Sequence, residues 1–442
     1  MAWYLEDGPE SDVVISSRIR LARNVRGYPF PELLLPGTAK ECYDRISKAF
    51  FSANEAMRRD YVEIVLADVP ELTVNSLVEK RLLSEDMLNK RASGRAIIRR
   101  DEAVSIMLGE EDHIRIQSMQ AGLNLVEAYE EAEKISLLLE EKLPLAFKPE
   151  FGFLTACPTN VGTGMRASVM VHLPALGRTK LLEKYLDSCR KAGLAVRGQY
   201  GENSEATGFV FQISNQMTLG LDESTAIKEL QTVVEQLIRR EHEARQYLWK
   251  NNRYEIEDQI YRSYGVLAEA RLISTEAAQL ELSNLRWGMA LGILPQLKPV
   301  TVNRLEVRIG SATLQREAGE VLPTRERDYR RAALIRQALA EDAADAGGAT
   351  SAAGAMSAAG AMSAGGATSA AGATSAAGAA SAGGAASAAG AASAGGAADA
   401  GGATSAGDAT DGKNSANGAE VAGSTPATGK EKADETNSNS AN

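Results

Sequence analysis

Alternation of apolar and polar residues is clearest in residues 11–23, SDVVISSRIRLAR, and is typical of a β-strand with one buried face. Such a strand places Ile19 and Leu21 on one face and Arg18 and Arg20 on the other. Strand-like runs recur at Val62–Val69, Ala96–Arg99, Val104–Leu108, Gly152–Ala156, Ser168–Leu173, Leu194–Arg197 and Phe209–Ser214. Because many of these runs follow one another with connections too short for a crossover helix, we expect a largely antiparallel sheet.

Helical patterns separate these runs and dominate the second half of the chain. Between Asp222 and Trp249 the apolar residues recur with the spacing of one helix face. Other helices are predicted at Ala121–Leu143, Arg178–Ala192, Tyr254–Leu272, Thr275–Leu291 and Arg325–Ala340, and a strand-like pattern remains at Val300–Ile309. The sequence predicts an α+β fold: an antiparallel-sheet domain flanked by helices over residues 1–255, then an all-α C-terminal domain over residues 256–340.

Composition changes abruptly after residue 340. Residues 341–442 are mostly Ala, Gly, Ser and Thr, and between residues 348 and 407 the sequence repeats every six residues, as in GATSAA and GAMSAA. Such a segment cannot bury enough apolar surface to offset the entropy lost on ordering. We therefore expect residues 341–442 to form a disordered tail.

The tail also carries most of the net charge. It contains ten acidic residues and three lysines, so residues 1–340 carry a charge of −3 out of −10 for the whole chain. A nearly neutral folded region has no broad positive field for nucleic acid. Any anion site must therefore be local.

Cysteine and histidine are scarce. Cys42, Cys157 and Cys189 are too few and too far apart for a disulfide framework or a zinc knuckle, and with three histidines in all we assign no residue to a resident metal. No signal peptide or apolar run of membrane-spanning length stands out. We expect a cytoplasmic protein that binds neither membrane nor nucleic acid directly.

Five arginines, Arg18, Arg20, Arg115, Arg166 and Arg197, lie in settings suited to one polyanion. A guanidinium is planar, permanently charged and rich in N–H donors, so it matches phosphate well. The glycine-rich run TNVGTGMR lacks the lysine and hydroxyl of a P-loop, so a nucleotide here would be held mainly by arginine. Taken alone, each arginine is better explained as a surface ion-pair residue.

Four segments together carry a family pattern. They are SSRIRLARN, EEDHIRIQ, TACPTNVGTGMRASVMVHLPAL, and VRGQYGE followed by SEATGFVFQISN. In this order they resemble the ATP:guanidino phosphotransferase family, which includes the arginine and creatine kinases. The resemblance extends from about residue 11 to residue 250, and the C-P-T-N element with its downstream arginine is highly specific.

The resemblance implies an enzyme that uses ATP and Mg²⁺ to phosphorylate a guanidinium. It assigns to Glu111 the orientation of the guanidinium and the acceptance of its proton, with Glu202 as the second glutamate and Cys157 as a thiol that contacts the guanidinium. The residues it implies for ATP are Ser16, Ser17, Arg18, Ile19, Arg20, Arg81, Arg115, Arg166, Ala167, Ser168, Val169, Met170, Arg197, Gly198, Gln199, Tyr200, Gly201 and Glu202. One departure is Gly109, which stands where the family has asparagine in N-E-E-D-H.

The chemistry agrees with these residue types. A protonated arginine has no free lone pair to attack phosphorus, so paired carboxylates are needed to align its nitrogen and take up a proton. Phosphoryl transfer otherwise needs charge stabilisation, which Mg²⁺ and an arginine cluster supply. Asp112 and Glu205 are expected to be structural, and His113 to be a hydrogen-bonded scaffold residue.

The position of the first motif suggests the substrate. Small-molecule guanidino kinases carry a helical domain before the SSRIR-like strand, whereas here that strand begins near residue 11. Without this domain the pocket should stay open and accept an arginine within a polypeptide. YRSYGVLAEAR and RDYRRAALIR also resemble the bacterial branch of the family that phosphorylates proteins. That branch implies protein substrates with exposed arginines, marking for a Clp chaperone-protease in stress response, a zinc-binding activator protein, and a homodimer formed through the helical domain.

One further motif, R-D-x-x-R-A, contains Arg327, Asp328, Arg331 and Ala332. In the bacterial branch it resembles a regulatory site that binds phosphoarginine. The alternative is a solvated basic stripe opposite Ile335 and Leu339.

The leading hypothesis is a kinase that phosphorylates arginine in proteins. A kinase for free arginine or another small guanidino compound is an alternative, as is a non-catalytic adaptor that binds phosphoarginine.

Overall fold

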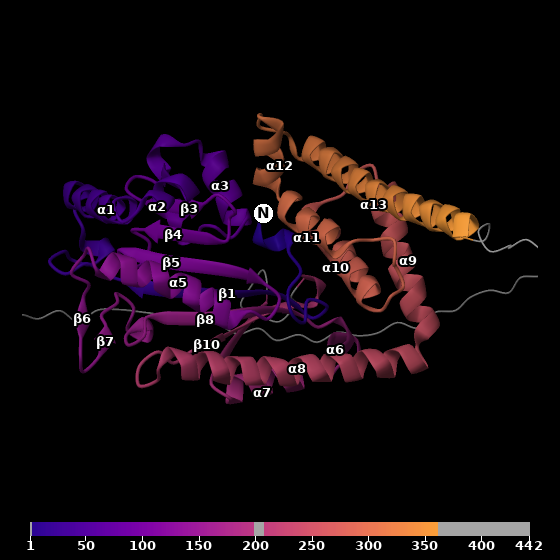
Figure 1. Cartoon of the computed structure of the whole chain (residues 1–442), viewed down its shortest axis with the longest axis horizontal. Coiled ribbons are helices and arrows are strands. Elements are labelled where there is room, and N and C mark those ends of the chain that lie inside the picture. Colours follow the sequence, from indigo (N-terminus) through magenta and orange to yellow (C-terminus); the bar gives the residue numbers. More distant parts are fainter. Residues whose placement is uncertain (1, 199–206, 361–442) are drawn as a thin grey trace, which may run out of the picture. The chain divides into compact units, whose positions relative to one another are not determined.

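The computed structural model describes residues 2–198 and 207–360, all within one compact unit. Its centre is a sheet with the strand order β2-β3-β4-β5-β1-β8-β10-β9, in which every neighbouring pair is antiparallel (Figure 1). The strands are β1 (Val14–Arg23), β2 (Tyr61–Val65), β3 (Arg95–Arg99), β4 (Val104–Leu108), β5 (Ile114–Ala121), β8 (Met165–His172), β9 (Leu194–Gly198) and β10 (Val210–Asn215). The α+β class and the antiparallel sheet predicted from the sequence are confirmed.

The remaining strands, β6 (Phe147–Lys148) and β7 (Gly152–Phe153), form a separate hairpin. Strand β7 is shorter than the strand-like run that the sequence predicted at Gly152–Ala156. Strand β5 was not predicted from the sequence. It is buried along most of its length and contains buried Arg115, Gln117 and Ser118. Buried polar residues hide the apolar alternation on which strand prediction depends.

Helices cover the apolar face of the sheet. They include α5 (Leu125–Glu140), which packs on β1 and β5, and α8 (Glu223–Asn251), which packs on β8 and β10. Ile19 and Leu21 are buried in the same apolar cluster as these two helices, as the alternation predicted. The other helices of this part are α1 (Pro36–Phe51), α2 (Glu55–Asp60), α3 (Glu71–Glu79), α4 (Asp86–Asn89), α6 (Pro174–Arg178) and α7 (Leu182–Lys191).

The C-terminal part is helical, with α9 (Arg253–Glu269), α10 (Thr275–Ala290), α11 (Pro299–Arg308), α12 (Ser311–Ala318) and α13 (Thr324–Gly360). The strand-like pattern at Val300–Ile309 was wrong, because this segment is α11. Pro299 stands at its first turn, where proline suits a helix. Val302, Leu305 and Ile309 then fall on one buried helical face.

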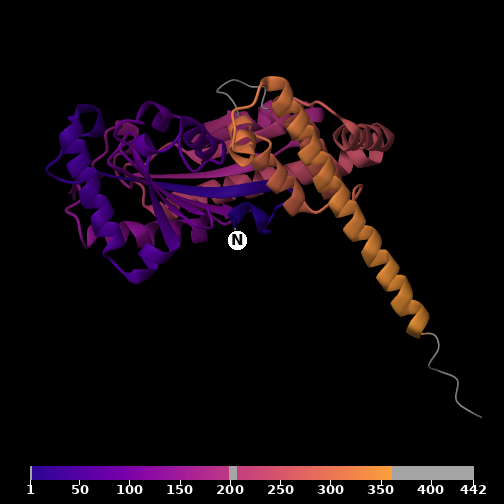
Figure 2. The same cartoon turned by 90° about the horizontal axis from the view of Figure 1, so that it is seen from above.

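Helix α13 continues past the predicted end at residue 340, and Figure 2 shows it extending beyond the other helices. Asp342 is buried and accepts hydrogen bonds from the Lys298 N–H and the Thr301 hydroxyl, at 2.9 Å each. Asp345 pairs with the Lys298 ammonium at 2.6 Å. The first part of the predicted tail is therefore helical, whereas residues 361–442 lie outside the described residues.

Helix α3 is joined to α12 by a carboxylate. Glu79 accepts hydrogen bonds from the N–H groups of Ala312 and Thr313, at 2.8 and 2.7 Å, and from the Thr313 hydroxyl at 2.8 Å. These N–H groups belong to the first turn of α12, where a helix has unpaired donors and favours negative charge. The contact connects the sheet-bearing part of the chain to the helical part.

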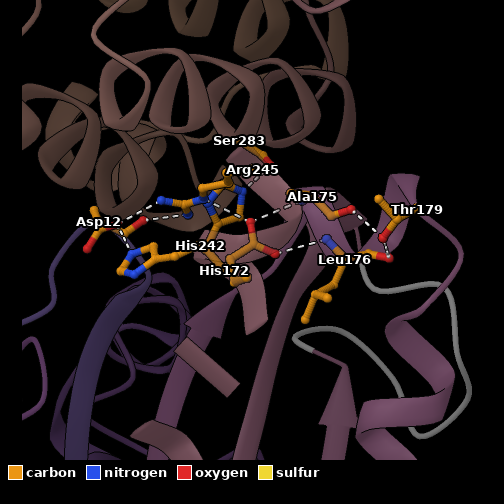
Figure 3. A network of polar contacts seen from close by, with 9 residues as sticks. Asp12, His172, Ala175, Leu176, Thr179, His242, Arg245 and Ser283 are labelled. Atoms are coloured by element: carbon orange, nitrogen blue, oxygen red, sulfur yellow. Dashed lines mark hydrogen bonds and ion pairs between the residues drawn. The ribbon is translucent and has the colours of Figure 1, made fainter. Parts of the chain in front are cut away.

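A second polar network fastens α8 to α6 and to the segment before β1 (Figure 3). Buried Glu241 accepts the N–H groups of Ala175 and Leu176 at 3.0 and 2.9 Å, and pairs with Arg245 at 2.9 Å. Arg245 also binds the Asp12 carboxylate at 2.7 Å. Burial raises the pKa of Glu241.

Among the described residues, no helix is long and apolar enough to span a bilayer.

Candidate active site

The polar face of β1 carries Arg20, and other strands of the same sheet supply further arginines. Arg20 lies directly opposite Arg166 in the β1–β8 register, Arg115 comes from β5, and Arg197 comes from β9. Together with Glu111 and Cys157 these four arginines line one hollow of about 340 Å³, which we call the arginine pocket. A neighbouring hollow of about 200 Å³ is lined by Arg18, Arg20 and Arg81, so Arg20 borders both.

The cluster is electrostatically strained without an anion. Burial, and then repulsion from Arg81, Arg166 and Arg115, lowers the pKa of Arg18 to about 9. Arg20 has its pKa lowered well below the usual range, again by burial and then by Arg18, Arg115 and Arg166. Among the residues that the structure describes, the buried Arg20 Nε has no hydrogen-bond acceptor. An anion with several oxygens would satisfy this donor and offset the repulsion.

Strand β10 orients two of the arginines through residues that the sequence analysis missed. Gln212 Oε1 accepts a hydrogen bond from Arg18 Nη2 at 2.7 Å, and Ser214 Oγ accepts two from Arg166 at 3.3 Å. The signal was the alternation of polar residues in FQISN, with Gln212 and Ser214 on the face opposite Phe211 and Ile213.

Two neighbouring glutamates bind Arg115 differently. Glu110 is fully buried and pairs with Arg115 Nη1 at 2.6 Å, whereas the Glu111 side chain is 41% exposed and pairs with Nη2 at 2.7 Å. Asn160 also donates to Glu111 Oε2, at 3.4 Å. Within the described ranges, Glu111 Oε1 accepts no hydrogen bond, so one oxygen remains for another donor in the arginine pocket.

The loop that carries Cys157 is held by backbone contacts. Thr155 donates its hydroxyl to the Cys157 carbonyl at 2.8 Å, and the thiol lies 3.0 Å from the Thr159 hydroxyl. Buried Asp112 accepts from the Ala156 N–H and from Asn24 Nδ2, both at 2.7 Å. These contacts give Asp112 a structural role, as predicted, and burial raises its pKa.

His113 is also part of the scaffold. Its Nδ1 accepts from the Val25 N–H at 3.1 Å, its Nε2 lies 2.8 Å from the Pro29 carbonyl, and burial lowers its pKa. A ring bonded at both nitrogens is not placed to act as a base.

Several residues implied for ATP do not point into the pockets. Ser17 donates to the Gly122 carbonyl at 2.8 Å and accepts from the Asn124 N–H at 2.9 Å, so its hydroxyl fixes a loop. Ile19, Ala167 and Val169 are fully buried in the apolar core, so the structure gives them a packing role. Glu202, Gln199, Tyr200 and Gly201 lie outside the described residues.

The R-D-x-x-R-A motif is largely occupied by contacts within the protein. Arg331 is 1% exposed and donates to the carbonyls of Ile309 and Ile273 at 2.8 Å each and to the Asp328 carboxylate at 2.6 Å. Arg327 is only partly buried and donates to the Leu322 carbonyl at 2.9 Å. The alternative of a solvated basic stripe is therefore wrong for Arg331.

Two family models match the chain. The C-terminal catalytic domain of ATP:guanido phosphotransferases matches residues 41–244, and the protein-arginine kinase McsB C-terminal domain matches residues 253–349. Among solved structures, lombricine kinase aligns with 55% of this chain and 71% of its own at 26% identity, with a TM-score of 0.46.

Relatives with known names match most of the chain. A protein-arginine kinase of Brevibacillus brevis is 45% identical over 76% of this chain and 94% of its own length. One from Geobacillus stearothermophilus is 43% identical over 76% of this chain and 93% of its own length. From these relatives and both family models, the chain belongs to the protein-arginine kinases of the ATP:guanido phosphotransferase family.

Proposed function

We propose that this protein transfers the γ-phosphoryl group of ATP to arginine side chains of other proteins. The main supporting observation is that Glu111 and Cys157 share one pocket with four arginines. Such a pocket can hold a triphosphate on its cationic side and a guanidinium on its acidic side. Membership of the protein-arginine kinases gives the substrate class.

The carboxylate of Glu111 is placed to align the substrate. One of its oxygens is fixed by Arg115, and the other is the natural acceptor for a substrate N–H. As the N–P bond forms, Glu111 takes up the proton that leaves the attacking nitrogen. We assign Glu202 as the partner glutamate and Cys157 as a contact to the guanidinium, both by resemblance to the family.

The arginines are proposed to bind the phosphates. A group of positive side chains with an unsatisfied Arg20 Nε fits the charge that spreads over phosphoryl oxygens during transfer. Magnesium would supply further positive charge to offset the charge of the phosphates. We propose that it enters with the nucleotide.

A labelling experiment tests this function. The protein is incubated with Mg²⁺, ATP and a denatured arginine-rich protein, and intact mass is read without acid, because N–P bonds hydrolyse in acid. We expect added phosphoryl groups on the substrate protein. Labelling confined to free arginine would favour a small-molecule kinase, and binding of phosphoarginine peptides without any labelling would favour an adaptor.

The remaining roles are proposals from the family. They comprise a cytoplasmic function in stress response, delivery of marked proteins to a Clp chaperone-protease and activation by a zinc-binding protein. We also propose a catalytic domain up to about residue 255 and a helical domain after it, which agrees with the two separate family matches. A homodimer through the helical domain is supported by exposed Tyr254 and Tyr261 on α9, and light scattering in solution would test it.

We propose that the R-D-x-x-R-A motif binds phosphoarginine as a regulatory site. Because Arg331 is occupied by internal acceptors, including Asp328 Oδ1, the groups proposed to meet a ligand are Arg327 and the second Asp328 oxygen, Oδ2. Arg327 suits the phosphoryl group, and Asp328 suits the guanidinium N–H groups.

A further inference from the structure

The hairpin β6–β7 projects beside the loop that carries Cys157, and it exposes apolar side chains. Phe147 is 43% exposed, Phe151 is 50% exposed, and Leu219 on a neighbouring segment is 51% exposed. They surround a hollow of about 350 Å³, which we call the hairpin hollow. Single exposed apolar residues are common, but several around one concavity mark a binding surface.

The hairpin hollow and the arginine pocket are lined by neighbouring residues of one loop. Cys157, Thr159 and Gly164 line the arginine pocket, whereas Gly162 and Thr163 of the same loop line the hairpin hollow. A polypeptide whose arginine enters the first pocket therefore has neighbouring residues beside the second.

Hydrogen bonds hold the segments that separate the two hollows in place. Phe153 and Gly162 exchange backbone hydrogen bonds at 2.8 and 3.2 Å. The Thr218 hydroxyl donates to the carbonyls of Thr159 and Val161, at 2.8 and 2.7 Å. These bonds fix the Cys157 loop, the hairpin and the segment before α8 against one another.

A cation–π contact supports the base of the hairpin. The guanidinium of Arg23, at the end of β1, lies 3.5 Å from the Phe153 ring centroid. The Phe147 ring meets Phe153 edge to face at a centroid distance of 5.2 Å. Phe147 therefore stands on a base that is anchored to the central sheet.

The charges that line the hairpin hollow restrict which polypeptide segments can bind there. Glu150 and Glu223 line it together with the apolar side chains, which disfavours acidic segments and favours neutral or basic ones. Apolar side chains near an accessible arginine are characteristic of unfolded polypeptides, because folded proteins bury them.

We propose that the hairpin hollow binds an apolar side chain of the substrate polypeptide close in sequence to the arginine that is phosphorylated. This inference rests on the proposed kinase function and specifies its substrates. The enzyme would select arginines in unfolded, apolar, non-acidic segments. Docking there would lower the KM for such segments and leave the chemistry at Glu111 unchanged.

Peptides with a single arginine test the proposal on the wild-type protein. One leucine is moved through the positions on either side of the arginine, with serine elsewhere, and kcat/KM is compared with that of N-acetyl-arginine methylamide. We expect one or two positions to raise kcat/KM roughly ten-fold, the gain expected from burying one such side chain. Equal values at all positions would overturn the inference while leaving the kinase function intact, whereas no labelling of any peptide would overturn the kinase function itself.

A variant pair locates the effect. Phe151→Ser combined with Leu219→Ser should abolish the positional preference and leave kcat/KM for the methylamide unchanged. Val126→Ser is the matched control, because Val126 is 48% exposed, lies in the first turn of α5 and does not line the hairpin hollow. Persistence of the preference in the double variant, or an equal loss with the methylamide, would refute the assignment; if the double variant is unstable, Leu219→Ser alone is scored the same way.

Discussion

The Tyr43 hydroxyl occupies the space that a side chain at Gly109 would need. A Cβ built on Gly109 would lie 2.3 Å from the Tyr43 hydroxyl oxygen, and Gly109 has a φ of +80°. Tyr43 is 2% exposed, and burial raises its pKa to about 12. The phenol thus fills the place left by the asparagine that the family carries before its two glutamates.

Restoring that asparagine should therefore harm this protein. We expect Gly109→Asn to lower the free energy of unfolding by about 1–3 kcal/mol, because the overlap forces Tyr43 to move. Gly193→Asn is the control, since Gly193 has a φ of +78° but no neighbouring atom within 4 Å of its Cβ position. Urea unfolding compares the two, and equal losses would show that backbone strain, not Tyr43, is responsible. In a Tyr43→Ala background, Gly109→Asn should cost less unfolding free energy than it does in the wild type, because the overlap is removed.

Glu111 and Glu110 should differ in their effects. Glu111→Gln should reduce protein labelling by roughly 10²–10⁴-fold, because it removes the proton acceptor. Nucleotide affinity, measured by calorimetry, should change little. Glu110→Gln should instead lower the melting temperature, since it leaves buried Arg115 with a weaker partner. A Glu111→Gln protein that still labels substrate at the wild-type rate would remove Glu111 from the mechanism.

Arg20 is expected to destabilise the nucleotide-free protein while contributing to ATP binding. Replacing it with glutamine relieves repulsion from Arg18, Arg115 and Arg166, so we expect the nucleotide-free protein to melt a few degrees higher, a gain of roughly 1 kcal/mol. Differential scanning calorimetry should also show that ATP no longer raises the midpoint. A lower midpoint without ATP would contradict the repulsive arrangement.

Arg331 and Arg327 should separate structure from ligand binding. Arg331→Gln should cost about 2–4 kcal/mol in unfolding free energy, because its buried charge has several acceptors. Arg327→Gln should leave stability nearly unchanged and weaken binding of a phosphoarginine peptide. Unchanged peptide binding in Arg327→Gln would refute the regulatory site.

Asp222 should give helix α8 an acid-sensitive start. Hydrogen bonds from Ser224 and from Thr225 lower its pKa from the usual 3.8 to about 2. The folded state therefore favours the ionised carboxylate more than the unfolded state does. The resulting stabilisation is present above about pH 4 and is lost as the pH falls toward 2. Asp222→Asn caps the helix without titrating. The difference in unfolding free energy between wild type and this variant should thus shrink between pH 5 and pH 3.

Local patterns predicted much of the fold but not its buried polar parts. Ile19 and Leu21 revealed the core face of β1 because their neighbours are polar. Strand β5 was missed because Arg115 and Gln117 are buried polar residues that line the pockets, so they interrupt the apolar pattern of the strand. The segment at Val300–Ile309 misled because β-branched residues can line one helical face as readily as they alternate in a strand.

The candidate site was recognised from its charged residues and not from their supports. Gln212, Ser214 and Asn160 act by holding an arginine or a glutamate. The alternation in FQISN places Gln212 and Ser214 on the polar face of a strand, but it does not reveal which arginines they hold. The burial of Arg331 was equally hidden, because its acceptors are the backbone carbonyls of Ile273 and Ile309, far away in the chain.

The carboxylate of Glu79 has a consequence for exchanging parts between relatives. Glu79 lies within the first family match, whereas the α12 N–H groups that donate hydrogen bonds to it lie within the second. A chimera joined in the gap between those matches would combine an acceptor from one parent with donors from another. Keeping residue 79 and residues 311–313 from a single parent is therefore the condition for recombining the two halves without loosening α3, which leads directly to Arg81.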